Sequence, residues 1–285
     1  MRRIGFAVVC IVTAFLAPFT SESQRPSEMR RVGYVQANFG GFPEGFYEAL
    51  REGLQDLGYQ EGRNLDLVYR ASDDGARVAD IVAELLRLKS EVIVAPGGAA
   101  SIAHEGTKTA PIVFSYSGDP IEADFVKSIG RPGRNMTGIT WLAFDLVGKR
   151  LELLKEAAPR LSRVAVLANP AHPGEQRELA ETQNTARAVG ATVQYHQVKV
   201  PADFDGAFGA SVKNRANALL VFPDGLTMRH RGQIAEFAAK HQLPSVFGWR
   251  EYVEAGGLMS YGSNRVQTAR RLAVYVDKIL KGQTR

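Results

Sequence analysis

The chain has 285 residues, of which 45% are hydrophobic and 23% charged, and its formal net charge is +5. This composition is that of a globular protein with a large core, and the length exceeds what one core usually fills, so two lobes are expected. Lys and Arg are scattered among Asp and Glu and form no basic block that could follow a phosphate backbone, which argues against nucleic-acid binding.

The first 23 residues have the segment order of a secretory signal peptide. Two arginines precede an apolar run over residues 4–19, and a small-x-small triplet ends at Ser23. The run is shorter than the roughly 20 apolar residues of a membrane-spanning helix, so cleavage after Ser23 and export to the periplasm are expected. The one cysteine, Cys10, lies in this run, too early for a lipoprotein cysteine. The mature chain would then have no cysteine, and its stability would depend on its core.

From residue 31 onward, short apolar runs alternate with helical periodicity. Strands are predicted at residues 31–37, 64–70, 91–95, 111–115 and 136–140. Between the first two, small and apolar residues recur at intervals of three and four from Phe46 to Leu57, which predicts a helix that Gly58 ends. The same spacing predicts a helix over residues 78–86.

The pattern restarts after residue 140. Helices are predicted at residues 147–158, 179–189, 204–212, 226–239 and 269–280, and strands at 163–169, 192–198, 218–224, 244–248 and 256–262. Strands that alternate with helices require crossover connections, which build a parallel sheet covered on both faces. We therefore predict an α/β protein with two doubly wound parallel-sheet lobes.

Ligands of open α/β sheets bind outside the carboxyl ends of the strands. The predicted loops at these ends are QANFGGFPEG, PGGAAS, YSGDP, NPAHPGE and PDGLT, all small, polar or rich in glycine. Most are expected to open a helix, whose free N–H groups and positive dipole end suit a carboxylate. Gly97, Gly98 and Ser101 would let a ligand approach that backbone closely.

Several residues of these loops also have a structural interpretation. Asp119 and Asn169 each precede a proline, as an N-cap residue precedes a proline at the first position of a helix. Turn chemistry accounts for Asp224 as well as ligand contact does. The rings of Phe39 and Tyr116 fit either stacking on a ligand or packing.

The sequence contains no recognisable catalytic or cofactor-binding arrangement. The five histidines show no metal-ligand spacing, the G-x-S-x-G motif of serine hydrolases does not occur, and GGFPEG lacks the spacing of a dinucleotide fingerprint. Trp141 and Trp249, near predicted strand ends, are predicted to be packing residues. We therefore expect binding without chemistry: not an enzyme, with no catalytic residue, metal or cofactor.

Four separated segments carry a resemblance to a known family. In chain order they are PIVFSYSGDP, RPGRNMTGITWLAFDLVGKRLELLKEAAP, VEAGGLMSYG and AVYVDKILKG. Together they resemble the ABC transporter substrate-binding proteins of the tryptophan/tyrosine-type family, over residues 31–282. The resemblance implies a type I periplasmic-binding fold, in which two lobes joined by a hinge close on a small molecule. The implied N-terminal lobe comprises residues 30–140 and 257–285, and the C-terminal lobe residues 141–256.

The resemblance also implies a function and a set of contacts. A monomeric receptor would deliver a small-molecule ligand, an amino acid and by analogy with characterised relatives an aromatic one, to an ABC permease in the inner membrane. The binding-site residues that follow from the family's cleft loops and the loop analysis are Asn38, Phe39, Gly98, Ala99, Ser101, Tyr116, Ser117, Asp119, Asn169, Asp224 and Tyr261. The ligand carboxylate is expected at the N–H groups around residues 98–101, and its ammonium at Asp224 or Asp119.

The chain departs from the family pattern at its end. Relatives usually continue past the segment ILKG with a linker, a strand and a helix that return to the second lobe, whereas this sequence stops at Arg285, so a third hinge crossing is expected to be missing. A sensing module of the same fold, signalling to a membrane receptor, is the alternative to transport, and the sequence does not separate the two. The loop aromatics also fit purines and other flat solutes.

Overall fold

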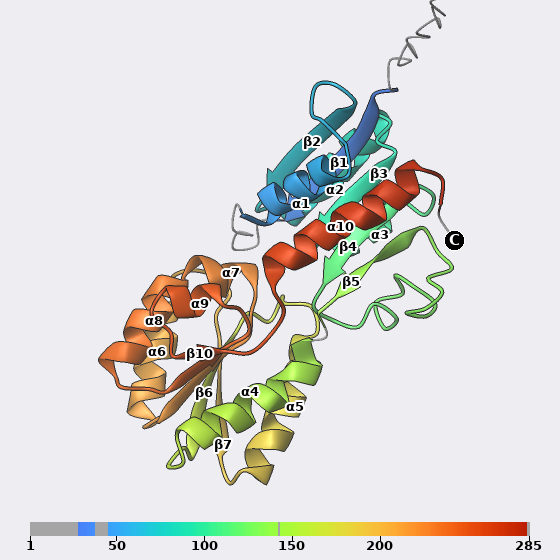
Figure 1. Ribbon diagram of the computed structural model, residues 1–285. Helices are drawn as coiled ribbons and strands as arrows, with labels where there is room; N and C mark the ends of the chain where they lie inside the picture. Colours follow the sequence, from blue (N-terminus) through green and yellow to red (C-terminus); the bar gives the residue numbers. More distant parts are fainter. Residues whose placement is uncertain (1–27, 38–44, 142, 284–285) are drawn as a thin grey trace, which may run out of the picture.

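The computed structural model describes residues 28–37, 45–141 and 143–283. They form two lobes, each built on a five-stranded parallel sheet (Figure 1). The α/β fold with two doubly wound parallel-sheet lobes that the sequence predicts is therefore confirmed. The predicted signal peptide, Asn38 and Phe39 lie outside the described residues. None of the helices in these described ranges is long and apolar enough to cross a membrane.

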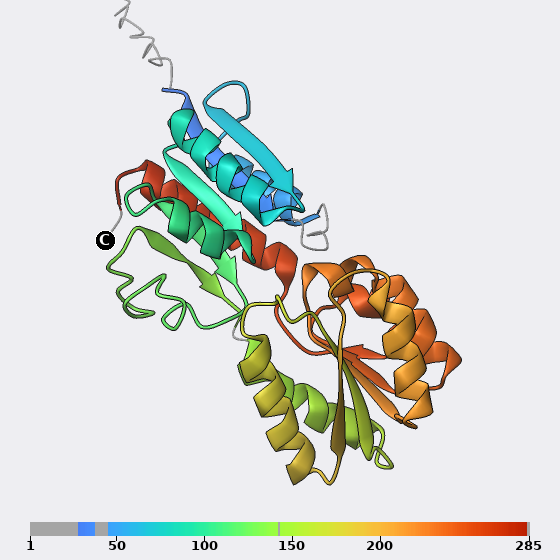
Figure 2. The same ribbon diagram turned by 180° about the vertical axis from the view of Figure 1, so that it is seen from behind.

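The sheet of the first lobe has the strand order β2-β1-β3-β4-β5. Its strands are β1 (Arg30–Ala37), β2 (Leu65–Ser72), β3 (Val92–Pro96), β4 (Ile112–Tyr116) and β5 (Met136–Thr140). All neighbours pair in parallel, so their carboxyl ends meet at one edge. In both views this edge faces the second lobe (Figures 1 and 2).

Helices cover both faces of the first sheet. They are α1 (Gly45–Asp56), α2 (Gly75–Arg87), α3 (Ala99–Gly106) and α10 (Arg265–Leu280). Side chains alternate between the two faces of a strand, so Val32 and Tyr34 of β1 pack in the same cluster as α1 and α10, whereas Val35 packs with α2 and α3. Figure 2 shows α2 and α3 covering the face opposite to α1 and α10.

The second lobe repeats this arrangement with the strand order β10-β9-β8-β6-β7. Its strands are β6 (Arg163–Ala168), β7 (Thr192–Gln197), β8 (Ala218–Val221), β9 (Ser245–Phe247) and β10 (Met259–Ser260). Its helices are α4 (Ala143–Ala157), α5 (Glu175–Ala188), α6 (Asp203–Lys213), α7 (Gly225–Arg229), α8 (Arg231–Lys240) and α9 (Glu251–Glu254). Leu151 of α4 and Ala186 of α5 pack on one face with Val164, whereas Phe204 and Phe237 pack on the other.

Within the described residues the chain passes between the lobes twice. The first crossing joins β5 to α4, and the second, at residues 261–264, joins β10 to α10. The sequence assigns residues 257–285 to the first lobe, but Met259 of β10 pairs with Val246 of β9. The second lobe therefore extends through Ser260, and the first lobe resumes with α10.

The helix predictions at Asp119 and over residues 226–239 are wrong. Asp119 and Pro120 do not open a helix: the Asp119 carboxylate accepts the N–H groups of Ile121 and Glu122, and the turn ends at Asp124, whose φ is +58°. The single helix predicted over residues 226–239 is two helices, α7 and α8, because His230 leaves helical geometry between them.

Candidate functional site

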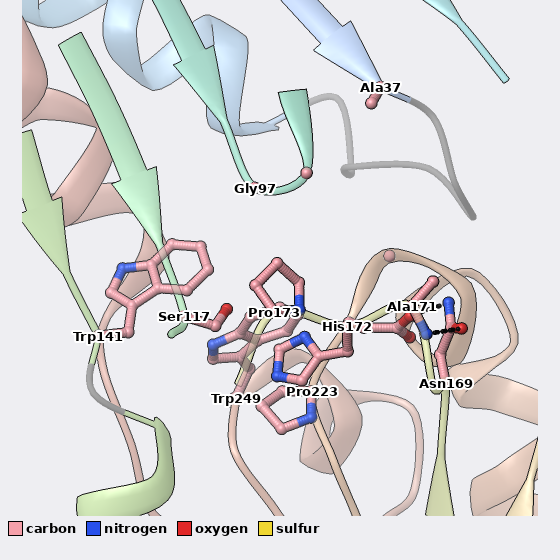
Figure 3. Close-up of a pocket in the computed structure, with 13 residues that line it drawn as sticks. Ala37, Gly97, Ser117, Trp141, Asn169, Ala171, His172, Pro173, Pro223 and Trp249 are labelled. Carbon is pink, nitrogen blue, oxygen red and sulfur yellow. Dashed lines mark hydrogen bonds between the residues drawn. The ribbon is translucent and has the colours of Figure 1, made fainter. Parts of the chain in front are cut away.

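A pocket lies between the two lobes, at the carboxyl ends of both sheets (Figure 3). The first lobe and the first crossing contribute Ala37, Gly97, Gly98, Ser117 and Trp141, and the second lobe contributes Asn169, Ala171, His172, Pro173, Pro223, Asp224, Gly225 and Trp249. Most of these residues end a strand or lie within two residues of its end. The pocket is thus where the strand-end analysis expects a ligand.

Two tryptophans form an aromatic wall of the pocket. Trp141 follows β5 and Trp249 follows β9, and their rings meet edge to face with centroids 5.4 Å apart. The Arg265 guanidinium lies 4.6 Å from the centroid of the Trp249 ring, from the side of α10. The sequence predicts only packing for both tryptophans. Both do pack in the core shared by the lobes, but they also line the pocket.

Asp224 places a buried carboxylate in the pocket wall. Its Oδ1 accepts the N–H of Thr227 at 2.8 Å and the Thr227 hydroxyl at 2.9 Å, while Oδ2 accepts Nδ2 of Asn169 at 2.6 Å. It is the N-cap of α7 in a capping box, so helix capping, and not only a turn, explains its position. Burial raises the pKa of the Asp224 carboxyl, and nearby His172 and these hydrogen bonds oppose the shift.

The N-terminus of α3 faces the pocket from the first lobe. Gly97 has a φ of +60°, a conformation that favours glycine, and its N–H donates to the carbonyl of Ser115 at 2.7 Å. The turn places Gly98 at the N-cap of α3 and in the pocket lining. Because the first N–H groups of a helix have no partner within it, this end is suited to a carboxylate.

Four of the residues predicted from the sequence meet in this pocket: Gly98, Ser117, Asn169 and Asp224. Asn169 is not the N-cap that its proline suggests, because α5 begins only at Glu175. Its side-chain oxygen instead accepts the N–H of Ala171, which shapes the loop that carries His172.

The other predicted residues within the described ranges lie outside the pocket lining. Ala99 is fully buried in the core, and Ser101 lies on α3 beyond the residues that line the pocket. The ring of Tyr116 packs against Phe125, with centroids 4.8 Å apart. Asp119 pairs with Arg177 of α5 at 3.4 Å. Tyr261 follows β10 and is 42% exposed.

Five pocket residues whose side chains contain a ring were not predicted as ligand contacts. They are Trp141, His172, Pro173, Pro223 and Trp249. His172, Pro173 and Pro223 belong to loops that the sequence analysis identifies, NPAHPGE and PDGLT, so the strand-end rule applied to whole loops would have included them. Nothing in the sequence distinguishes a tryptophan that packs in the core from one that also lines a pocket.

This geometry defines a two-lobed small-molecule-binding protein of the type I periplasmic-binding class, with its pocket between two parallel sheets. A family model described as ABC transporter substrate binding protein matches residues 44–285. The chain belongs to this family, and the resemblance carried by the four sequence segments is confirmed.

Individual proteins share sequence or fold with this chain. A tyrosine-binding protein of Clostridioides difficile (strain R20291) is 24% identical over 244 residues, which cover 85% of this chain and 68% of that protein. The crystal structure of a conserved domain protein from Vibrio cholerae aligns with a TM-score of 0.81 at 25% identity, covering 90% of this chain and 86% of the other. An ABC domain from Streptococcus pneumonia, in complex with L-Trp, aligns with a TM-score of 0.80 at 21% identity and the same coverage.

Proposed function

We propose that this protein is an exported receptor that captures an aromatic amino acid between its lobes and delivers it to an ABC permease in the inner membrane. The observation that carries the proposal is the pocket itself, in which a tryptophan pair, a buried carboxylate and a helix N-terminus converge from both lobes. The two relatives named for tyrosine or bound to L-Trp support the choice of an aromatic amino acid.

The pocket offers one complementary group for each part of such a ligand. The ligand carboxylate would accept the N–H of Gly98, where α3 begins; the N–H of Ala100 already donates to the carbonyl of Gly97. The ammonium would lie near Asp224, and the ring would stack on the wall formed by Trp141 and Trp249. Asp119, the alternative partner for the ammonium, pairs with Arg177 and is not among the residues that line the pocket.

The remaining parts of the proposal concern the whole protein. We propose that residues 1–23 direct export to the periplasm, that the protein works as a monomer, and that closure of the lobes, with no chemical step, retains the ligand. The membrane permease would then recognise the closed form. Neither a metal nor a cofactor has a role in this scheme.

Intrinsic fluorescence tests the ligand assignment directly, because Trp141 and Trp249 are the chain's two tryptophans and both line the pocket. We expect L-tyrosine, excited where only tryptophan absorbs, to change the emission of the mature chain in a saturable way. L-Tryptophan is titrated by calorimetry instead, since it fluoresces itself. A ligand at about 100 times its Kd should also raise the free energy of unfolding by roughly 2.7 kcal/mol.

Leucine, adenine and benzoate serve as comparison ligands in both assays. Preference for either aromatic amino acid supports the proposal. Saturable binding of adenine or benzoate alone would replace the ligand class, and a cooperatively folded protein that binds none of the five compounds would contradict it.

A further inference from the structure

Three buried ionisable side chains extend from the pocket wall into the second lobe. Glu178 of α5 is fully buried, and its Oε1 accepts Nη1 of Arg150 on α4 at 2.9 Å. The side chains of Arg150 and His172 are each 2% exposed. His172 lines the pocket, and its Nε2 lies 3.3 Å from Oε2 of Glu178. We call His172, Glu178 and Arg150 the buried relay.

The far end of the buried relay contacts the second crossing between the lobes. Arg150 Nε donates to the carbonyl of Tyr261 at 2.8 Å, and Tyr261 is the first residue after β10. The guanidinium lies close to two glycines: a Cβ added to Gly248 would lie 3.2 Å from Arg150 Nη2, and one added to Gly262 would lie 3.4 Å from it. Arg150 therefore lies directly against the backbone of the crossing.

The pocket end of the buried relay is incomplete. Although Nε2 of His172 and Oε2 of Glu178 are close, they are not aligned for a hydrogen bond, and neither atom has another hydrogen-bond partner among the described residues. A buried carboxylate oxygen without a donor is costly. A hydrogen bond between these two atoms, which lie 3.3 Å apart, would satisfy both.

Stability alone is a weak explanation for these charges. Moving an ion pair out of water costs several kcal/mol per ion, and apolar side chains of similar volume often replace a buried pair with no loss of stability. The relay does, however, connect the pocket at His172 with the crossing at Tyr261 through directed polar contacts. An apolar cluster would provide no such directed contacts.

We propose that the buried relay couples occupation of the pocket to the second crossing, with Arg150 and Glu178 acting as positioning residues. A ligand that turns His172 toward Glu178 strengthens the hold of Arg150 on the Tyr261 carbonyl, which fixes the angle between the lobes. The part that concerns a ligand rests on the proposed function. The connection between His172 and Tyr261 does not, and it is tested without any ligand.

The test is hydrogen exchange at the second crossing, read at the Tyr261 N–H, which donates to the carbonyl of Phe247. The variants are His172→Phe, which keeps a ring but removes both nitrogens, the double variant Arg150→Met with Glu178→Met, and all three substitutions together. The matched control replaces Lys149 and Glu152 by Met, because this pair lies on the same helix but is about half exposed.

We expect the Tyr261 amide to exchange at least about tenfold faster in the double variant, with no change in the control. In His172→Phe we expect about threefold faster exchange, because this variant removes the 3.3 Å polar contact with Glu178 that is already present without a ligand. In the triple variant the His172 substitution should add nothing further, because the relay is already broken. An unchanged exchange rate in His172→Phe would overturn the proposal. So would a His172 substitution that accelerates exchange by the same factor in the wild type and in the double variant.

Two further measurements separate this proposal from the proposed function. Arg150→Lys keeps a positive charge beside Glu178 but lacks the planar guanidinium that also reaches the Tyr261 carbonyl, so it too should accelerate exchange. If the double variant does not fold, this variant decides whether the relay acts on the crossing. Added L-tyrosine should slow exchange at Tyr261 in the wild type but not in Arg150→Lys. If the wild type does not bind L-tyrosine, the ligand assignment fails, and the ligand-free comparison still decides whether the relay exists.

Discussion

At the scale of single residues, Asp224 shows how one side chain can serve the fold and the pocket together. Its Oδ1 accepts the N–H of Thr227 and so caps α7, and its Oδ2 accepts a hydrogen bond from Nδ2 of Asn169. The carboxylate therefore cannot rotate away from the pocket. The same burial that fixes it also disfavours its charge, and the pKa of the carboxyl is raised. An ammonium group in the pocket would relieve that cost.

The raised pKa of Asp224 predicts two pH effects of opposite sign. Ligand affinity should fall as the pH decreases through the raised pKa, because protonation removes the charge that attracts the ammonium. The stability of the ligand-free protein should change the other way. A carboxyl whose pKa is higher in the folded state takes up protons on folding. Its contribution to stability is therefore fully present below the pKa of the unfolded chain and is lost as the pH rises through the raised pKa of the folded state.

Calorimetric titrations with L-tyrosine and urea unfolding, both over the acidic range, measure these effects. Asp224→Asn is the reference, since it keeps the shape and lacks the titration: we expect weaker binding, by about tenfold or more, and a flat pH profile. Wild-type affinity that follows the same profile as Asp224→Asn would show that the carboxylate does not meet the ammonium.

At the scale of helices and strands, periodicity predicts elements well where one face is buried in a regular core. The helix predicted from Phe46 to Leu57 is α1, displaced by one residue, because the apolar spacing reflects its packing on β1. The turn at Asp119 was missed for a different reason. A local cap signal does not say whether a helix follows, and here a left-handed Asp124 closes the turn.

The site was predictable only as a set of loops. The rule that ligands lie at strand ends identifies the edge of each sheet at which the pocket lies, and hence Gly98, Asn169 and Asp224. It cannot say which side chains of a loop turn inward. Tyr116 ends β4 with its ring against Phe125, and a sequence does not reveal such a contact between distant segments.

Strand β5 provides a prediction at this scale, because it is an edge strand paired only with β4. A Cβ on Gly138 would lie 2.0 Å from the carbonyl oxygen of Phe114, its partner in the register. Gly138→Ala must therefore push the two strands apart, and we expect the free energy of unfolding to fall by about 1–3 kcal/mol.

The matched control is Gly206→Ala in α6, where an added Cβ meets no atom within 4 Å. Alanine is the better helix former, so this variant should be more stable by about 0.5–1 kcal/mol. Denaturant unfolding of both variants measures the difference. Equal stabilities would show that β5 shifts freely and does not define the edge of the sheet.

At the scale of the whole molecule, the lobes also meet beside the pocket, through backbone as well as charge. Gly174 has a φ of +85°, and a Cβ on Gly118 would lie 2.9 Å from Cε1 of Tyr116 in its own lobe and 3.2 Å from the nitrogen of Gly174 in the other lobe. Next to this contact, Arg177 of α5 pairs with Asp119 at 3.4 Å and with Glu122 at 3.0 Å. The ion pairs are exposed enough that each should contribute only about 0.2–1 kcal/mol. The glycine contact, in contrast, sterically limits how closely the lobes can approach each other.

These two contacts predict different results when they are changed one at a time. Gly118→Ala should act as a wedge that rotates one lobe against the other, altering the small-angle scattering curve and weakening L-tyrosine binding by about tenfold. Arg177→Gln should weaken binding by less than about fivefold, and the loss should shrink in high salt because exposed pairs are screened. Gly130→Ala, in the same lobe but with open space around its Cβ, is the control and should behave as the wild type. If Gly118→Ala scatters and binds like Gly130→Ala, the lobes do not depend on this contact for their arrangement, and the crossings alone set the angle between them.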